Sequence, residues 1–272
     1  MEGTPDEIPA EAESELSPQD RQEAIRERIL THGFVSVGEL ADAFAVSGMT
    51  IRRDLELLEE QGWVRKVRGG ATAEPSAFYH GDVRHRMQAM AAAKGEIAAH
   101  ALGHVERGHT IMLDESTTGY GLAQLLPNRR PVTVITNFLP SLQLLSRKPG
   151  IDLIALGGAY RPAYDAFLGL RTAESVGSMT ADLLFASTTA ITAGSCYHRS
   201  QETIEVKLAL MQAAARKILL ADHAKFGKRA VHHLASVTEF DLVIVDSGIA
   251  PEHLEELRQL GVAVEVAPAS DA

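Results

Sequence analysis

The sequence contains a single cysteine, Cys196, among its 272 residues. One cysteine excludes an intramolecular disulfide and is typical of a protein that stays in a reducing compartment. No secretory leader opens the chain, and no uninterrupted apolar run reaches the roughly 18 residues that a membrane-spanning helix needs. We therefore expect a soluble, cytoplasmic protein that does not enter a membrane.

Motifs for metals, nucleotides and common cofactors are also missing. The sequence has no His-Glu-x-x-His pair, no paired Cys-His zinc spacing, no Gly-x-Gly-x-x-Gly after a strand, and no Walker-type phosphate loop. The histidines lie mostly alone, and the neighbours His232 and His233 would point to opposite faces of a strand. From these absences we expect that the protein has no metal site and no bound cofactor.

The net charge is −10, which argues against a general binder of polyanions. Much of this charge is local, because seven acidic residues and no Lys or Arg precede Arg21. Together with three prolines, this composition predicts a disordered acidic tail over residues 1–16. The rest of the chain is only mildly acidic, so a basic face can still act locally.

Residues 36–60, SVGELADAFAVSGMTIRRDLELLEE, predict two short amphipathic helices joined by a tight turn. Ser36 and Glu39 form a capping box for the first helix, and Ser47 caps the second. The second helix has a buried stripe of Ile51, Leu55 and Leu58, and it carries Met49, Thr50, Arg52 and Arg53 near its start. In a helix-turn-helix that end meets the bases. The alternative is a helical hairpin whose arginines are merely solvated.

The following segment favours DNA binding over that alternative. From Trp63 to Ala71 apolar and basic residues alternate before a glycine pair, which predicts a hairpin wing. Trp63, Val64 and Val67 are expected to pack, while the basic side chains are available for phosphates. A supporting helix, beginning after the cap Ser17 and ending at Gly33, completes the unit.

Residues 17–73 are therefore predicted to form a winged helix-turn-helix. Its candidate DNA-contacting residues are Ser47, Met49, Thr50, Arg52 and Arg53 in the helix and Arg65, Lys66, Arg68 and Gly69 in the wing.

Beyond a joint marked by Pro75 and Ser76, short apolar strands alternate with helices. Such runs predict a Rossmann-like, largely parallel sheet covered by helices on both faces. The fold class is thus α/β with a small α+β N-terminal module. We predict a linker over residues 74–94 and a second domain over 95–268. The predicted strands are 110–113, 131–135, 151–156, 183–186, 218–221 and 242–245.

In such a sheet, ligands bind outside the carboxyl ends of the strands. The hydroxyls of residues 116–118 would suit an anion there, although they could also form a plain helix cap. Gly157 and Gly158 could admit a ligand to the backbone or simply end a strand. Asp222 and Lys225 could orient hydroxyl and phosphate groups or form a surface ion pair. The residues alone leave these alternatives open.

The stretch from Arg21 to Ala71 resembles the DNA-binding domain of the DeoR family of bacterial transcription regulators. The match rests on VSGMTIRRDL over residues 46–55, LEEQG over 58–62 and VRGGA over 67–71. The family often has His before the glycine pair, where Arg68 stands here. Arg68 keeps a hydrogen-bond donor at that position but changes its geometry.

The C-terminal half is similar to the sensor domain of the same family, a sugar-phosphate sensor related in fold to ribose-5-phosphate isomerase and to the CoA transferases. The resemblance implies a phosphate-type loop after the first strand, effector contacts from several other strand ends, and a basic segment between the domains. The implied effector residues are Asp114, Ser116, Thr117, Thr118, Thr136, Asn137, Gly157, Gly158, Arg161, Glu202, Lys207, Asp222 and Lys225. Arg86 and Lys94 correspond to the basic segment, which is implicated in effector response in some members.

One departure from the family bears on the ligand. The family loop is usually Asp-Ala-Gly-Thr-Thr, whereas this chain has Glu115 and Ser116 in place of Ala-Gly. A carboxylate at Glu115 would repel phosphate if it pointed inward. Either Glu115 faces solvent, or the ligand differs from the usual anion.

Three classes of function remain. The preferred one is a sequence-specific transcription regulator, a repressor of a carbohydrate-utilisation operon that responds to a phosphorylated sugar or related metabolite. The second is a sugar-phosphate isomerase or deaminase with an accessory DNA-binding module, and the third is an architectural DNA binder without a ligand. Because one winged helix has a limited interface, a homodimer or homotetramer on repeated half-sites of an operator is expected.

Overall fold

The computed structural model describes residues 17–60, 64–73 and 83–269. The chain divides after residue 81 into two compact units. The tail 1–16, Gly62, Trp63 and the joint around Pro75 lie outside the described residues, so the predictions made for them stay predictions. So does the packing of the Leu30 side chain. The exact domain limits given above also stay predictions.

The N-terminal unit combines a helical bundle with a small antiparallel sheet. Its elements are α1 (Pro18–His32), β1 (Phe34–Ser36), α2 (Val37–Ala43), α3 (Gly48–Glu60), β2 (Val64–Val67) and β3 (Gly70–Ala73). The strands pair in the order β1-β3-β2. A helix-turn-helix followed by a hairpin is the winged architecture that the sequence predicts.

Local capping fixes where these helices begin and end. The Ser17 side chain accepts a hydrogen bond from the Asp20 backbone N–H, Pro18 occupies the first turn, and Gly33 ends α1 with φ 77°. Ser36 and Glu39 form the predicted capping box of α2. The core then forms from the predicted apolar stripes, with Leu40, Phe44, Ile51, Leu55 and Leu58 all buried.

The C-terminal unit is built on a seven-stranded, fully parallel sheet, counted over the described residues. Its order is β15-β14-β12-β9-β4-β5-β6. The strands are β4 (Thr110–Leu113), β5 (Val132–Thr136), β6 (Ile151–Ala155), β9 (Ala181–Ala186), β12 (Ala214–Ala221), β14 (Leu242–Val245) and β15 (Val264–Val266). Chain order therefore reverses between β4 and β9, which is the topological switch point of a doubly wound sheet.

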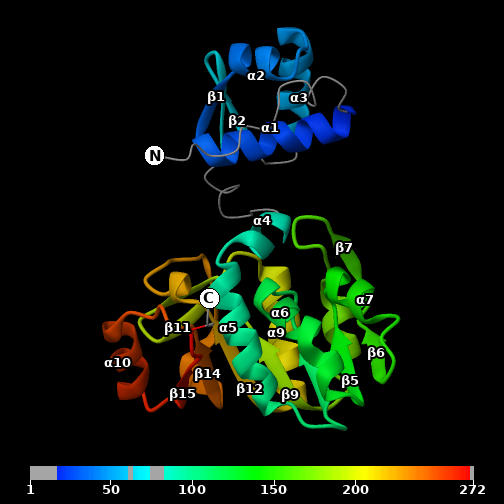
Figure 1. Cartoon of the computed structure of the whole chain (residues 1–272), viewed down its shortest axis with the longest axis vertical. Helices are drawn as coiled ribbons and strands as arrows, with labels where there is room; N and C mark the ends of the chain where they lie inside the picture. The colour runs from blue at the N-terminus through cyan, green and yellow to red at the C-terminus, as the bar shows by residue number, and fades with distance from the viewer. Residues whose placement is uncertain (1–16, 61–63, 74–82, 270–272) are drawn as a thin grey trace, which may run out of the picture. The chain divides into compact units, whose positions relative to one another are not determined.

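Helices cover both faces of this sheet, as Figure 1 shows. Ile111 and Leu113 of β4 belong to the buried cluster on one face, with residues of α5 (Ala91–Ala101), α6 (Thr117–Leu125) and α7 (Leu139–Leu145). Met112 belongs to the cluster on the other face, with residues of α8 (Leu170–Val176), α9 (Gln201–Ala213) and α10 (Pro251–Gln259), because successive strand residues point to opposite faces. The short helix α4 (Val83–Gln88) precedes α5. The predicted Rossmann-like class is confirmed.

Within the described part of the C-terminal unit, two small antiparallel sheets accompany the main sheet, and neither was predicted from the sequence. One pairs β10 (Ala190–Thr192), β11 (Ser195–His198) and β13 (His232–Ser236), and the other pairs β7 (Ala159–Arg161) with β8 (Ala166–Leu168). Short 3-10 turns complete the unit: η2 (Leu102–His104), η3 (Leu126–Arg129), η4 (His223–Lys225) and η5 (Val237–Glu239). No described helix is long and apolar enough to cross a bilayer.

Candidate DNA interface and effector site

The start of α3 presents the polar face that the sequence predicts for DNA contact. Arg52 and Arg53 are exposed, and Met49 is 73% exposed. Ser47 caps the helix by accepting from the Thr50 backbone N–H at 3.2 Å, and the Ser47 and Thr50 hydroxyls lie 2.9 Å apart. The first turn of α3 therefore offers two guanidinium groups beside a pair of hydroxyls.

Asp54 fixes this helix against α1, a role that was not predicted from the sequence. Its buried carboxylate accepts hydrogen bonds from Arg21 Nε at 2.8 Å and from Gln22 Nε2 at 2.9 Å. A buried carboxylate is tolerated only with such partners. Asp54 interrupts the apolar stripe of Ile51, Leu55 and Leu58, and this was the signal that could have revealed it.

The wing is a tight hairpin whose glycines are needed. Gly69 has φ +88°, and a Cβ on Gly70 would lie 2.3 Å from the Val35 carbonyl oxygen. Arg65 and Arg68 are exposed. Val67 is 36% exposed, so the predicted packing of this side chain is wrong. The β2 backbone turns the Val67 side chain outward, whereas the Val64 side chain is buried.

Lys66 contacts α3. Its backbone N–H donates to Glu59 at 2.7 Å, and its Nζ lies 3.3 Å from Glu56 and 3.5 Å from Glu59. The hydrogen bond with Glu56 raises the pKa of Lys66. This pair links the wing to the recognition helix, beside a pocket of about 520 Å³ that Arg52 and Gly69 also line.

In the C-terminal unit, the switch point places Asp114 at its centre. Asp114 follows β4, is fully buried, and accepts from the backbone N–H groups of Ser116 at 3.0 Å and Ser187 at 2.7 Å. Lys207 of α9 also donates to it and to the Ser187 carbonyl oxygen. Asp114 and Lys207, two predicted site residues, are thus in direct contact.

Glu115 lies in the same buried cluster and does not face solvent. It is 2% exposed, and its Oε1 lies 3.0 Å from Lys207 Nζ. Burial by itself lowers the pKa of Lys207, but the charges of Asp114 and Glu115 outweigh it, so the pKa is raised. The second oxygen of Glu115 has no hydrogen-bond partner among the described residues.

Asp222 and Lys225 lie beyond the end of β12. Asp222 is 1% exposed, so it is not part of a surface ion pair. Lys225 Nζ is 3.8 Å from Asp222 Oδ2, and neither carboxylate oxygen of Asp222 has a hydrogen-bond partner in the described part of the chain. Burial lowers the pKa of Lys225, although the charge of Asp222 opposes this.

Lys94 joins this group from α5. Its Nζ donates to the carbonyl oxygens of Arg86 and Ala89, and Thr117 Oγ1 donates to the same Arg86 carbonyl at 3.2 Å. Burial first, and then repulsion from Lys225, lowers the pKa of Lys94 to about 8. Lys94 of α5 and Lys225 of η4 therefore share the buried carboxylate of Asp222, and Arg86 of α4 is close enough for its charge to repel both lysines.

Several other candidates have contacts within the protein. Ser116 caps α6 by accepting from the Gly119 N–H at 2.9 Å. Thr136 accepts from the Phe138 N–H at 3.2 Å, and the Asn137 amide donates to the Phe167 carbonyl at 2.9 Å. Thr118 is buried at the start of α6. The helix-cap interpretation therefore holds for Ser116.

The diglycine turn and the Arg161 pair are organised by protein contacts as well. A Cβ on Gly158, which has φ +154°, would lie 2.0 Å from Thr172 Oγ1, and that hydroxyl donates to the Gly157 carbonyl at 2.8 Å. Arg161 and Glu202 form a bidentate pair with contacts of 2.7 and 2.5 Å, and both side chains are exposed.

Tyr164 and His198 approach the same cluster and were not among the predicted residues. The Arg86 guanidinium lies 5.9 Å from the Tyr164 ring centroid, and the Tyr164 and His198 rings are 6.0 Å apart. Burial, followed by the nearby charges of Lys207 and Arg86, lowers the pKa of His198 well below its usual range. His198 ends β11, and Tyr164 lies in the turn between β7 and β8. These strands belong to the two small sheets that the sequence did not predict, which leaves little local signal.

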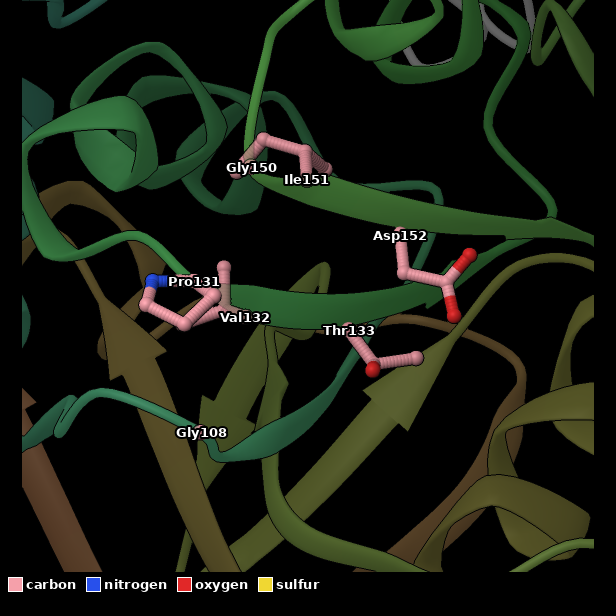
Figure 2. A pocket seen from close by; sticks show the side chains of 7 residues that line it. All are labelled: Gly108, Pro131, Val132, Thr133, Gly150, Ile151 and Asp152. Atoms are coloured by element: carbon pink, nitrogen blue, oxygen red, sulfur yellow. The ribbon is translucent and has the colours of Figure 1, made fainter.

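A pocket of about 350 Å³ lies at the opposite, amino end of the strands (Figure 2). Pro131 and Gly150 there precede β5 and β6, and Gly108 precedes β4. None of the predicted site residues lines it. The polar cluster at the carboxyl ends is therefore the better candidate for an effector site, in keeping with ligand binding in doubly wound sheets.

Comparison with protein families decides the identity. The DeoR-like helix-turn-helix domain matches residues 21–77, and the DeoR C terminal sensor domain matches residues 89–247. The chain belongs to the DeoR family. Its DeoR-type sensor domain alone accounts for more than half of the sequence.

Related DeoR-type proteins match nearly end to end. A protein of Escherichia coli O157:H7, provisionally named the aga operon transcriptional repressor, is 31% identical over 90% of this chain and 92% of its own length. The transcriptional repressor AccR of Agrobacterium fabrum is 30% identical over 85% and 91%. The lactose phosphotransferase system repressor of Lactococcus lactis is 30% identical over 90% and 97%. The chain is thus a DNA-binding transcription regulator and not an enzyme.

Solved structures add little to this assignment. A ribose 5-phosphate isomerase from Methanocaldococcus jannaschii matches with a TM-score of 0.37 and 17% identity, over 50% of this chain and 54% of that one. This structural similarity is too weak to establish a shared fold, so the predicted relation in fold to ribose-5-phosphate isomerase stays a prediction.

Proposed function

We propose that this DeoR-family regulator represses a carbohydrate-utilisation operon and is released from its operator by a phosphorylated sugar or a related anionic metabolite. The effector would bind at the carboxyl ends of β4, β9 and β12. The names of two relatives, a repressor of a lactose phosphotransferase system and an aga operon repressor, support a role in carbohydrate metabolism.

The observation that carries the proposal is the imbalance around Asp222. Lys94 and Lys225 interact there with one buried carboxylate, and the charge of Arg86 repels both lysines. The pKa of Lys94 falls to about 8 through burial and this mutual repulsion. A bound anion would relieve that repulsion. Asp222, whose two oxygens lack hydrogen-bond donors in the described part of the chain, would accept from sugar hydroxyls.

The remaining acidic groups of the loop are partly neutralised. Lys207 pairs with both Asp114 and Glu115, so one of these two negative charges is balanced inside the protein. Lys207 would thus support the site from within the core, and we assign contact with the anion to Lys94, Lys225 and Arg86. Arg161 and Glu202 would act at the rim, where they hold each other.

DNA recognition in this proposal uses α3 and the wing. Arg52 and Arg53 would contact base edges, and the basic wing residues would contact phosphates. A homodimer or homotetramer would place two such modules on repeated half-sites, since a single module buries little surface. Action on an operator implies a cytoplasmic location.

The test pairs a Lys225→Ala variant with a Lys148→Ala control, because Lys148 is exposed and lies outside this group. An operator fragment selected in vitro with the purified chain is titrated by fluorescence anisotropy. The titration is repeated with ribose 5-phosphate, galactose 6-phosphate and fructose 6-phosphate, with the free sugars, and with inorganic phosphate. Conversion of each sugar phosphate is followed in parallel.

We expect at least one sugar phosphate to release the parent and the control from DNA without being converted. Lys225→Ala should bind the operator as tightly as the parent and resist release, since a ligand shifts an equilibrium only through its differential affinity for the two states. Release of Lys225→Ala at the parent's effector concentration would remove Lys225 from the site. Failure of every phosphorylated sugar in the panel would count against a sugar-phosphate effector.

A further inference from the structure

A second polar cluster lies away from the effector site, where two histidines of one helical segment face a carboxylate. His100 is in α5 and His104 ends η2, which continues directly from α5. Glu265 comes from the edge strand β15. His100 Nε2 lies 2.7 Å and His104 Nε2 2.8 Å from the same oxygen, Glu265 Oε2. Sequence positions 165 apart are thereby brought together.

The cluster corrects the view that the histidines lie alone. Residues i and i+4 share a helix face, so the spacing of His100 and His104 is that of a helical histidine pair. That spacing was visible in the sequence. The partnership with Glu265 could not be predicted, because only the packing of α5 beside β14 and β15 brings Glu265 to this face.

Two imidazole nitrogens and one carboxylate oxygen are a common ligand set for zinc and for related transition metals. The three ligand atoms lie within 4.8 Å of one another. In a tetrahedral site with bonds of about 2.0 Å, ligand atoms are about 3.3 Å apart. The carboxylate oxygen would therefore need to withdraw by about half an ångström, which a side chain with 41% exposure on an edge strand allows.

The site is also open to solvent. A pocket of about 580 Å³ is lined by all three residues together with Glu96 and Pro268. Glu96 lies one turn before His100 and adds negative charge. Its carboxylate already accepts from the Ser247 N–H at 3.0 Å and from the Ser247 hydroxyl at 2.8 Å, so we do not count it as a ligand.

We propose that His100, His104 and Glu265 bind one divalent transition-metal ion of the zinc class, with water in the remaining position. Imidazole ligands favour zinc, cobalt, nickel and copper over magnesium and calcium. The ion would join the carboxyl end of the α5–η2 segment to the edge strand β15. This proposal does not depend on the effector proposed above.

The test uses the full chain without a polyhistidine tag, freed of metal with EDTA and exchanged into chelator-free buffer. Cobalt(II) is added while the visible absorption spectrum is recorded, and zinc chloride is titrated by calorimetry. We expect one ion per chain, cobalt bands typical of four-coordinate nitrogen and oxygen ligation, and a higher melting temperature with zinc.

Variants assign the ligands. His100→Gln with His104→Gln should weaken zinc binding by at least about tenfold, abolish the cobalt bands and remove the rise in melting temperature. Glu265→Gln should keep the fold and weaken binding, because an amide is a poorer ligand than a carboxylate. The matched control removes two other histidines, His232→Gln with His233→Gln, and should behave like the parent.

Two results would overturn the assignment. One is a parent chain that gives no cobalt bands and no saturable zinc binding, which would leave a pair of histidines hydrogen-bonded to a carboxylate. The other is binding that survives in the His100/His104 variant or is lost equally in the His232/His233 control. Circular dichroism and operator binding of each apo variant ensure that these outcomes do not reflect misfolding.

Discussion

The Nζ of Lys207 lies 3.0 Å from Oε1 of Glu115, and both side chains are almost completely buried. The same ammonium group donates to Asp114, so one lysine of α9 pairs with two carboxylates of the β4–α6 loop. Glu115, which stands where the family has a small residue, therefore has a buried partner, although the lysine balances only one of the two negative charges. Of the two alternatives that the sequence left open for Glu115, exposure to solvent is excluded, because this side chain is buried beside Lys207.

Removing that lysine should destabilise the C-terminal unit. In a Lys207→Met variant, Asp114 and Glu115 would be left buried and uncompensated, and the free energy of unfolding should fall by about 3–5 kcal/mol. Urea denaturation followed by circular dichroism measures this. Lys217→Met is the matched control. Lys217 forms a long ion pair of 3.9 Å with the half-exposed Asp241, so its loss should cost about 0–1 kcal/mol. Adding Glu115→Gln to Lys207→Met should restore part of the lost free energy of unfolding. If Lys207→Met and Lys217→Met are equally stable, this account is refuted.

Arg52 and Arg53 should carry operator affinity. Each replacement by Ala is expected to cost about 1–3 kcal/mol if the arginine pairs with a base edge. Both side chains are exposed on α3, so the fold should be unaffected. Anisotropy titrations at one salt concentration compare the variants with Arg107→Ala, an exposed arginine of the other unit. A double variant that binds as tightly as the parent would mean that α3 is not the recognition helix.

The wing should act through phosphates. Loss of Arg65, Lys66 and Arg68 together should weaken binding to all DNA sequences alike and lower the slope of log affinity against log salt by about 0.9 for each lost contact. Lys66→Ala alone should matter less than Arg68→Ala, because Lys66 is already paired with Glu56 and Glu59. Titrations from low to moderate salt give these slopes. If the triple variant keeps the parent's slope, the wing packs against protein instead.

Effector binding should depend on pH through Lys94. Its pKa of about 8 reflects burial and the charge of Lys225, with Arg86 contributing and Asp222 opposing. An anion favours the protonated amine, so binding should take up a proton near pH 8, and affinity should be full below that pH and fall above it. The second pKa of a phosphate monoester, near 6, lies below this window. Calorimetry in buffers of different ionisation enthalpy measures the uptake, which Lys94→Met should abolish. Uptake that persists in Lys94→Met would assign the proton to another group.

Local chemistry in the sequence determined most of the secondary structure. The capping box of Ser36 and Glu39 and the stripe of Ile51, Leu55 and Leu58 involve neighbours within two turns, so their pattern alone predicts helix ends and buried faces. Six of the seven parallel strands in the described part of the chain were equally readable, because strands buried on both faces are continuous apolar runs. The short edge strand β15 was not predicted, because it is only partly buried and has no such run. Family membership could also be predicted, since the recognition helix and wing are contiguous motifs.

Tertiary structure decided what the polar residues contact. Asp54 of α3 contacts Arg21 of α1, and Glu115 of the β4–α6 loop contacts Lys207 of α9. Glu265 contacts His100 because β15 is the edge strand of the sheet. The residues next to a charged side chain in the sequence do not reveal whether it faces solvent, a ligand or a buried partner. Which partner it finds depends on the order of strands and the packing of helices, because ion pairs and hydrogen bonds act over a few ångströms between segments far apart in the chain.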